Sequence, residues 1–184
     1  MPLSFERRSL CHVEFGANRV KKMNKRLVVM RHAKSSWKSE ARSDHERPLN
    51  KRGKHDAPRM GRKLVDLGWQ PEVVISSDST RTKQTIEGMK FDDSVEVQFW
   101  RELYLSGIRE VVSFVAQVES HIQSLLVLGH NPGWEHVVQH LSDERVEMKT
   151  ATAALLEIES DDWNQAIRTS GEWNLIDVLY PREL

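Results

Sequence analysis

The sequence predicts an α/β fold, a three-layer sandwich in which helices flank a largely parallel central sheet. Short, continuous apolar runs at 27–30, 73–75 and 125–128 have the character of strands that are covered on both faces. Segments with the apolar spacing of helices lie between them, and this alternation is typical of α/β sandwiches. The 184 residues suit a single compact domain, which we expect to span residues 23–184.

The first half of the chain is expected to contain three strands and two helices in alternation. Pro58 lies inside the first helix and should kink or split it, with Asp56 helping to cap the second part. Gly68 ends this helix. The third strand alternates polar and apolar residues, which indicates a more exposed position. In chain order these elements are expected at 27–30, 50–67, 73–75, 79–90 and 95–99.

The second half continues the alternation and ends in two strands. The apolar face of its first helix is formed by Ile108, Val111, Val112, Val115 and Ile122. After the strand at 125–128, a second helix has its own apolar face, formed by Trp134, Val137, Val138 and Leu141. The last strands are expected at 153–158 and 173–179, and Gly171 interrupts the segment between them.

Composition limits the classes of partner. Lys and Arg total 27, as do Asp and Glu, so no net charge favours a nucleic acid or an anionic membrane surface. No apolar run approaches the roughly 20 residues of a membrane span. Cys11 is the single cysteine and cannot form an intramolecular disulfide, which indicates a reducing compartment, and we expect the cytoplasm. Residues 1–22 lack the apolar core of a secretory signal and are expected to be a disordered extension.

Three loops that leave buried strands contain most of the chemically reactive residues. Arg31-His32-Ala33-Lys34 follows the first strand, Ser76 to Thr82 follows the second, and Gly129-His130-Asn131-Pro132-Gly133 follows the strand at 125–128. In an open α/β sheet, ligands bind outside the carboxyl ends of the strands. Two arginines and two histidines should therefore converge at one edge of the sheet.

This set of residues favours phosphate chemistry. Arg31 and Arg81 each offer a planar fork of donors to phosphate oxygens, and Arg81 falls in the first turn of its helix, where an anion is also stabilised. Asn131 as a cap and Pro132 at the first helical position should start the next helix. A neutral imidazole can attack phosphorus as a nucleophile.

With these motifs in place, the sequence resembles the histidine phosphatase (phosphoglycerate mutase-like) superfamily, and within it the small SixA-type phosphohistidine phosphatase branch. The resemblance extends from about Lys25 to Leu184. It rests on five stretches: Val29 to Ser35, Asp44 to Gly53, Ile75 to Thr85 with Arg81 inside it, Leu103-Tyr104, and Gly129 to Gly133.

The resemblance implies a phosphoglycerate mutase-like fold and a catalytic set. His32 would be the nucleophile that becomes phosphorylated, Arg31 and Arg81 would hold the phosphoryl group, and His130 would stabilise the transition state. The family needs no metal, and we expect no cofactor.

Three further residues are candidates for substrate binding. Lys34 either contacts the phosphate or is only a surface side chain of the loop after the first strand. Arg47 either guides an anionic substrate or holds the loop before Pro48. Asn131 lies next to His130 and completes this set.

The chain departs from the family pattern at the general acid. Larger members have a glutamate proton donor after the third strand, where the register of Leu103-Tyr104 puts Leu105. Glu102 and Asp44 are the remaining candidates for a general acid.

The other histidines have simpler explanations. His136 and His140 have a spacing that can bind zinc, but they lie off the apolar face of their helix and are expected to be solvated. His45, His55 and His121 lie in charged surroundings and are expected at the surface.

The sequence therefore predicts a phosphohydrolase that acts on phosphohistidine in a partner protein. A phosphatase for small phosphate monoesters is the nearest alternative. A non-catalytic phosphoprotein-binding module is a third, although the presence of all four expected catalytic residues argues against it. No nucleic acid or membrane partner is expected, and the chain is expected to be a monomer.

Overall fold

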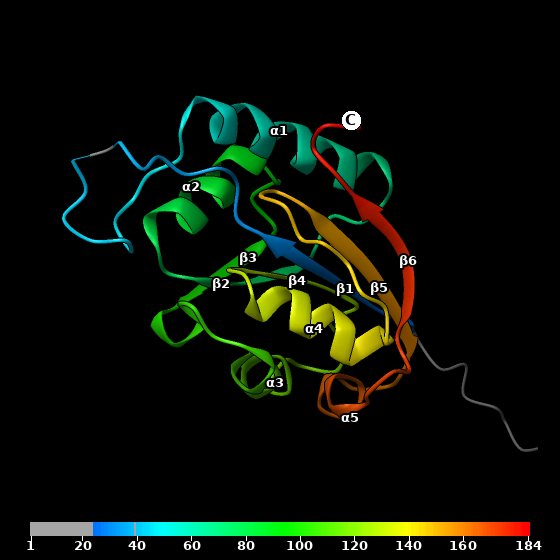
Figure 1. The fold of residues 1–184 in the computed structure, drawn as a ribbon. Helices are drawn as coiled ribbons and strands as arrows, with labels where there is room; N and C mark the ends of the chain where they lie inside the picture. Colours follow the sequence, from blue (N-terminus) through cyan, green and yellow to red (C-terminus); the bar gives the residue numbers. More distant parts are fainter. Residues whose placement is uncertain (1–23, 39) are drawn as a thin grey trace, which may run out of the picture.

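The computed structural model describes residues 24–38 and 40–184, which form one six-stranded sheet with helices on both faces (Figure 1). The expectation for residues 1–22 lies outside this range. The elements are β1 (Asn24–Arg31), α1 (Lys51–Asp66), β2 (Val73–Ser77), α2 (Thr80–Met89), β3 (Glu96–Trp100), the 3₁₀ helix η1 (Arg101–Leu103), α3 (Ile108–Val115), β4 (Ser124–Gly129), α4 (Gly133–Ser142), β5 (Ala153–Glu159), α5 (Trp163–Arg168) and β6 (Asn174–Leu179).

The sheet has the strand order β3-β2-β4-β1-β5-β6, and it is mixed. The three pairings among β3, β2, β4 and β1 are parallel, whereas β5 is antiparallel to both β1 and β6. The expected sandwich class holds, but the expectation of a largely parallel sheet needs this correction. After α4 the chain returns to the carboxyl end of β1, where the Ala151 N–H donates to the carbonyls of Arg31 and His32. From there β5 can only run in the opposite direction to β1.

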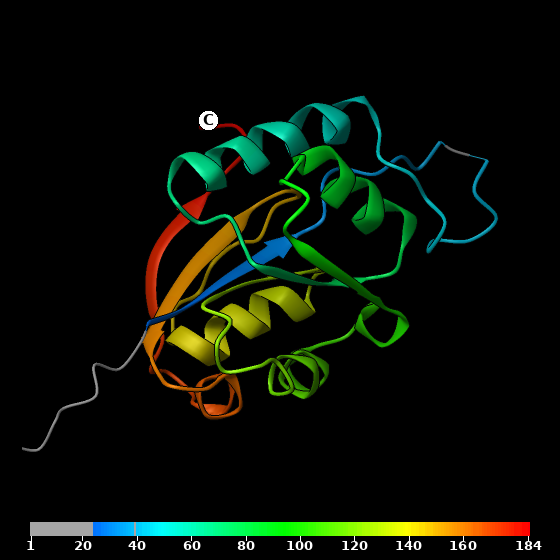
Figure 2. The same ribbon diagram turned by 180° about the vertical axis from the view of Figure 1, so that it is seen from behind.

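Two apolar layers enclose the sheet. Helices α1 and α2 cover one face, and α3, α4 and α5 cover the other (Figures 1 and 2). Along β1, Val28 and Met30 pack into the layer beneath α1, while Leu27 and Val29 pack into the layer that contains the buried α4 residue Trp134. A strand covered on both faces has no polar alternation, which explains the continuous apolar run in the sequence.

Helix α1 is unbroken despite Pro58. Asn50 caps it, and its side chain accepts a hydrogen bond from the Gly53 N–H at 2.9 Å. The expected split at Pro58 is absent, and Asp56 is not a cap, because its carboxylate accepts from Arg52 and lies beside His55. Packing of the apolar face of α1 onto the sheet compensates for the one backbone hydrogen bond that proline removes.

The remaining helices differ from expectation in two places. Helix α3 ends at Val115, so Ile122 lies beyond it, although Ile122 still packs against the same core. Helix α5 was not anticipated. Its cap is Asp162, whose side chain accepts from the Gln165 N–H at 2.7 Å. Among the described residues, no helix combines the length and the apolar character that crossing a membrane requires.

Candidate active site

A pocket of about 270 Å³ opens where the loops after β1 and β4 meet the start of α2. It brings together all the candidate residues named from the sequence except Glu102. Its lining consists of Arg31, His32, Lys34, Ser35, Trp37, Asp44, Arg47, Arg81, Leu105, His130, Asn131 and Thr150. The loops that follow β1 and β4 and the start of α2 therefore meet at one edge of the sheet, as expected.

His32 follows β1 directly and is held with one ring nitrogen unprotonated on the pocket side. Its Nδ1 lies 2.7 Å from the carbonyl oxygen of Ala33, an acceptor, so Nδ1 is the nitrogen that bears the proton. The lone pair then resides on Nε2, which accepts from Nε of Arg81 at 3.2 Å. The Ala33 N–H donates to Thr85 Oγ1 of α2 at 3.0 Å, which fixes the backbone beside the ring.

The environment keeps His32 neutral. Burial lowers the pKa of His32 to about 3; the hydrogen bond to the Ala33 carbonyl opposes this, and the positive charges of Arg81 and Arg31 add to it. The imidazole is therefore unprotonated on Nε2 near neutral pH, which is the form that a nucleophile requires.

Arg81 makes hydrogen bonds to several of the groups that line the pocket. It is the second residue of α2, only 3% exposed, and its position in the first turn agrees with the expectation. Besides the bond to His32, its Nη2 lies 3.2 Å from His130 Nδ1 and donates to an Asp44 carboxylate oxygen at 3.0 Å. Its Nη1 donates to the Asp44 carbonyl. One guanidinium thus connects both histidines.

His130 lies across the pocket from His32, with ring centroids 5.1 Å apart. Because Arg81 donates to Nδ1, the proton of the neutral ring resides on Nε2, which is 3.0 Å from Ser77 Oγ. Burial lowers the pKa of His130 to about 2, and the neighbouring His32 and Arg81 add to this effect. His130 is therefore a neutral side chain, held in one orientation on the side of the pocket opposite His32.

Arg31 and Asn131 are both held by the backbone at Met148. The Nη1 of Arg31 and the Nδ2 of Asn131 both donate to the Met148 carbonyl, at 2.9 Å each, and Asn131 also donates to Glu135 at 2.7 Å. The expectation that Asn131 caps α4 is wrong, because Pro132 occupies the cap position and the amide of Asn131 is engaged elsewhere. Among the described residues, buried Nε of Arg31 and Oδ1 of Asn131 have no hydrogen-bond partner.

Comparison with known proteins identifies the family. The profile of the Histidine phosphatase superfamily (branch 1) matches residues 27–104. A solved structure from Nakamurella multipartitia, assigned as phosphohistidine phosphatase SixA, is 30% identical, with a TM-score of 0.73 over 86% of this chain and 96% of that chain. This chain belongs to the SixA-type branch of the histidine phosphatase superfamily.

Two further relatives are similar over most of their length. A second structure assigned as SixA, from Agrobacterium tumefaciens, is 25% identical, with a TM-score of 0.71 over 85% of this chain and 98% of that chain. An uncharacterized chloroplastic protein of Arabidopsis thaliana is 33% identical over 91% of this chain and 83% of its own length. Membership of the SixA-type branch supports a phosphatase activity.

In this SixA-type pocket Asp44 is a hydrogen-bond acceptor. Its carboxylate accepts from Arg47 at 2.5 Å, from the Tyr104 hydroxyl at 2.6 Å and from Arg81 at 3.0 Å. Burial raises the pKa of Asp44, but the hydrogen bonds from Tyr104 and Arg47 and the charge of Arg81 outweigh it and hold the pKa well below its usual range. A carboxylate that stays ionised has no proton to donate near neutral pH, which argues against Asp44 as the general acid.

The other candidate acid is not brought to the pocket. Glu102 lies exposed on η1 and is absent from the pocket lining, whereas Leu105 is part of that lining. Leu105 therefore stands near the reacting groups, as the register of Leu103-Tyr104 suggested, and it cannot supply a proton.

Arg47 holds the loop and does not offer a free fork of donors. Its Nε donates to the Ser36 carbonyl at 2.8 Å, and its Nη2 donates to Ser35 Oγ at 2.7 Å. Trp37 covers the guanidinium, with its ring centroid 3.3 Å from Cζ. Of the two roles considered for Arg47, these contacts favour the structural one. Lys34 lines the pocket beside this loop.

Sequence reasoning missed three residues around the site. Tyr104 and Ser77 belong to the motifs named above but were assigned no role. The structure shows that Tyr104 hydrogen-bonds to Asp44 and that Ser77 hydrogen-bonds to His130. His45 was expected at the surface in charged surroundings; it is paired with a carboxylate, but its side chain is only 19% exposed. Its Nε2 lies 2.6 Å from an Asp78 carboxylate oxygen, and its ring packs edge-on against Tyr104 at 4.9 Å.

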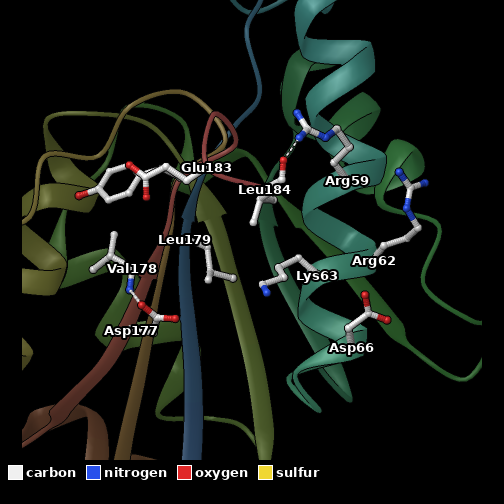
Figure 3. Close-up of a pocket in the computed structure, with 10 residues that line it drawn as sticks. Arg59, Arg62, Lys63, Asp66, Asp177, Val178, Leu179, Glu183 and Leu184 are labelled. Atoms are coloured by element: carbon white, nitrogen blue, oxygen red, sulfur yellow. Dashed lines mark hydrogen bonds between the residues drawn. The ribbon is translucent and has the colours of Figure 1, made fainter.

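A larger pocket, of about 480 Å³, lies between α1 and β6 (Figure 3). Arg59 donates there to the carbonyls of Pro181 and Leu184. The lining mixes basic and acidic side chains and includes no histidine and none of the predicted site residues. Volume alone would suggest this larger pocket as the active site, but the side chains able to transfer a phosphoryl group line the smaller pocket. Within 24–38 and 40–184, no cluster of three or more His, Cys, Asp or Glu side chains could hold a metal ion.

Proposed function

We propose that this chain removes the phosphoryl group from phosphohistidine on a partner protein, through a covalent phosphohistidine intermediate on His32. The observation that carries the proposal is the neutral His32 ring, whose Nε2 lone pair faces the Arg81 guanidinium inside the pocket. This arrangement presents a nucleophile and the positive charge for a phosphoryl group at the same point.

The reaction would proceed in two displacements. Nε2 of His32 forms a bond to phosphorus while the phosphorus–nitrogen bond of the substrate breaks, and the electron pair stays on the leaving nitrogen. Arg81 and Arg31 would balance the charge of the phosphoryl oxygens during the transfer. Water then attacks phospho-His32 and releases phosphate, and His32 returns to the neutral form, with its proton on Nδ1 and hydrogen-bonded to the Ala33 carbonyl.

The missing acid supports phosphohistidine as the substrate. An alkoxide leaving group is strongly basic and needs a proton as its bond to phosphorus breaks. A phosphorylated imidazole leaves as neutral imidazole once its other ring nitrogen is protonated, which happens near a pKa of about 6.5. Among the described residues lining the pocket, Asp44 is the one carboxyl group, and its lowered pKa keeps it ionised.

The rim of the pocket supports a protein substrate. Trp37 is 77% exposed and Leu105 is 60% exposed, and both line the pocket. A small phosphate ester would leave both apolar side chains in water, whereas a protein surface around the phosphorylated histidine would cover them.

A substrate panel tests the proposal. It holds a protein phosphorylated on histidine by phosphoramidate, free phosphohistidine, a phosphoserine peptide and a sugar phosphate. We expect the phosphohistidine protein to give the highest kcat/KM. Faster cleavage of the sugar or serine phosphate would instead establish the small-ester alternative.

Two sets of variants sharpen the test. Trp37→Ala should lower kcat/KM for the phosphorylated protein at least tenfold more than for free phosphohistidine, whereas Ile176→Ala, an exposed apolar side chain on β6, should not separate the two substrates. Glu102→Gln and Asp44→Asn should each keep phosphohistidine turnover within about tenfold of wild type, below the roughly 10²–10⁴ expected for loss of a general acid. A thousandfold loss in either variant would restore a carboxyl acid to the mechanism.

We also propose that the chain works as a monomer in a reducing compartment, the cytoplasm being our first choice. The Arabidopsis relative described as chloroplastic makes a plastid the alternative. Sedimentation of the purified protein and imaging of a tagged chain decide these two points.

A further inference from the structure

The donors beside His32 are already paired inside the protein. The two carboxylate oxygens of Asp44 accept hydrogen bonds from three side chains, those of Arg47, Arg81 and Tyr104. All but Tyr104 line the same pocket as the nucleophile. An anion held by two guanidinium groups next to His32 is the arrangement that a phosphoryl group also needs.

Arg81 has little capacity left for a ligand. Of its five N–H groups, four are directed at protein acceptors: His32 Nε2, His130 Nδ1, the Asp44 carbonyl and the Asp44 carboxylate. A phosphoryl group that binds Arg81 in bidentate fashion must therefore displace at least one of these acceptors.

Asp44 is the acceptor that can move. His32 is 7% exposed and His130 is 2% exposed, and both are anchored directly after strands in the centre of the sheet. The Asp44 side chain is 43% exposed and belongs to the irregular segment between β1 and α1. Its carboxylate can turn into water, where it is well solvated, at little cost in burial.

We propose that Asp44 is an internal substitute for the phosphoryl group: its carboxylate holds Arg81 and Arg47 in place in the free enzyme and leaves when the substrate binds. This rests on the proposed function, because it assumes that the pocket receives a phosphoryl group. Asp44 is thus a positioning residue that competes with anions. In the free enzyme it keeps the two arginine side chains in position. After the reaction it competes with the phosphate product for them, which weakens binding of the product.

Binding of inorganic phosphate measures the competition directly. In titration calorimetry, Asp44→Asn should bind phosphate at least tenfold more tightly than wild type, because the amide is a weaker competitor for the guanidinium groups. Glu46→Gln is the matched control, since Glu46 is an exposed carboxylate on the same loop, and among the described residues its one hydrogen-bond donor is the Arg42 N–H. It should change phosphate affinity by less than about twofold.

A second variant distinguishes competition by the Asp44 carboxylate from the general effect of removing a negative charge near the pocket. Tyr104→Phe removes one of the donors that retain Asp44 and keeps both the ring and the net charge. If Asp44 is a competitor, its carboxylate is released more easily and phosphate affinity should rise about threefold. A general electrostatic effect predicts no change for this variant, and a merely structural role predicts weaker binding.

Two results would overturn the inference. One is Asp44→Asn binding phosphate no more tightly than Glu46→Gln; the other is a phosphate affinity of Tyr104→Phe that stays unchanged or falls. Thermal melting identifies an Asp44→Asn protein that fails to fold, in which case Tyr104→Phe decides. Wild type that hydrolyses phosphohistidine while the variants bind phosphate unchanged contradicts only this inference. Wild type that neither binds phosphate nor hydrolyses phosphohistidine contradicts the proposed function as well.

Discussion

At the scale of single residues, the protonation state of His32 connects the structure to the chemistry. Burial among guanidinium groups lowers its pKa to about 3, and the hydrogen bond from Nδ1 to the Ala33 carbonyl selects the tautomer. An exposed imidazole would be half protonated at pH 6.5 and partly lost as a nucleophile. The buried ring stays available through the whole neutral range.

The first prediction concerns the titration of this residue. His32 should show no protonation between pH 8 and pH 5, measured from its ring resonances by NMR and assigned with a His32→Gln spectrum. The sign for stability follows by linkage: between pH 6.5 and about 3 the unfolded chain binds a proton on this residue and the folded chain does not, so stability falls as the pH drops through that window. A midpoint near 6.5 for His32 would contradict the burial argument.

Single residues also show what the sequence could and could not predict about the site. Arg31, His32, Arg81 and His130 were predicted together because the carboxyl ends of parallel strands meet at one edge of the sheet. The role of Asp44 could not be predicted, because it acts across 37 residues through an irregular loop that has no periodic pattern.

At the scale of elements, the start of α1 supports the loop that bears the nucleophile. The Asn50 N–H donates to the Lys34 carbonyl at 2.9 Å, and Gly53 lies so close that an added Cβ would be 2.2 Å from the same oxygen. The neighbouring atom is backbone and cannot swing aside. This close approach explains the glycine inside the first turn.

The second prediction tests this contact. Gly53→Ala should lower the free energy of unfolding by about 1–3 kcal/mol, as overpacking does, although alanine is otherwise the better helix former. It should also reduce turnover, since Lys34 is pushed toward the pocket. Gly107→Ala is the control, because nothing lies within 4 Å of the added Cβ; Gly107 is the N-cap of α3, where alanine is less favourable than glycine, so this variant should lose less than about 1 kcal/mol. Urea unfolding measures both, and equal stabilities would refute the account.

The elements themselves were largely predictable where apolar periodicity was strong. The strands and helices α1, α2 and α4 lie close to their expected ranges, whereas α3 ends at Val115 and is shorter than expected. Local signals failed where packing decided the outcome: Pro58 is tolerated because α1 is held against the sheet, and the direction of β5 follows from the contact of Ala151 with the end of β1. Helix α5 was missed because it is short, although Asp162 was an available cap signal.

For the whole molecule, the third prediction concerns the domain boundary. Deleting residues 1–22 should change the Tm little, because that segment shows neither helical nor strand periodicity. Calorimetric melting of the shortened chain measures this. A large fall in Tm would place the segment within the domain.

The fourth prediction concerns metals. Activity on phosphohistidine should survive EDTA, since Arg31 and Arg81 provide the positive charge at the pocket. Complete loss of activity that a divalent ion restores would indicate a metal-assisted mechanism instead.

The central claim is that His32 accepts the phosphoryl group, and rapid-quench labelling tests it most directly. A radiolabelled phosphohistidine protein is mixed with the enzyme, quenched in alkali within milliseconds, and the site is located by mass spectrometry. Wild type should contain acid-labile phosphate on His32, and His32→Ala should contain none and show no turnover while it keeps its fold. Stoichiometric labelling of the His32→Ala protein, or phosphate on another residue of wild type, would contradict the account.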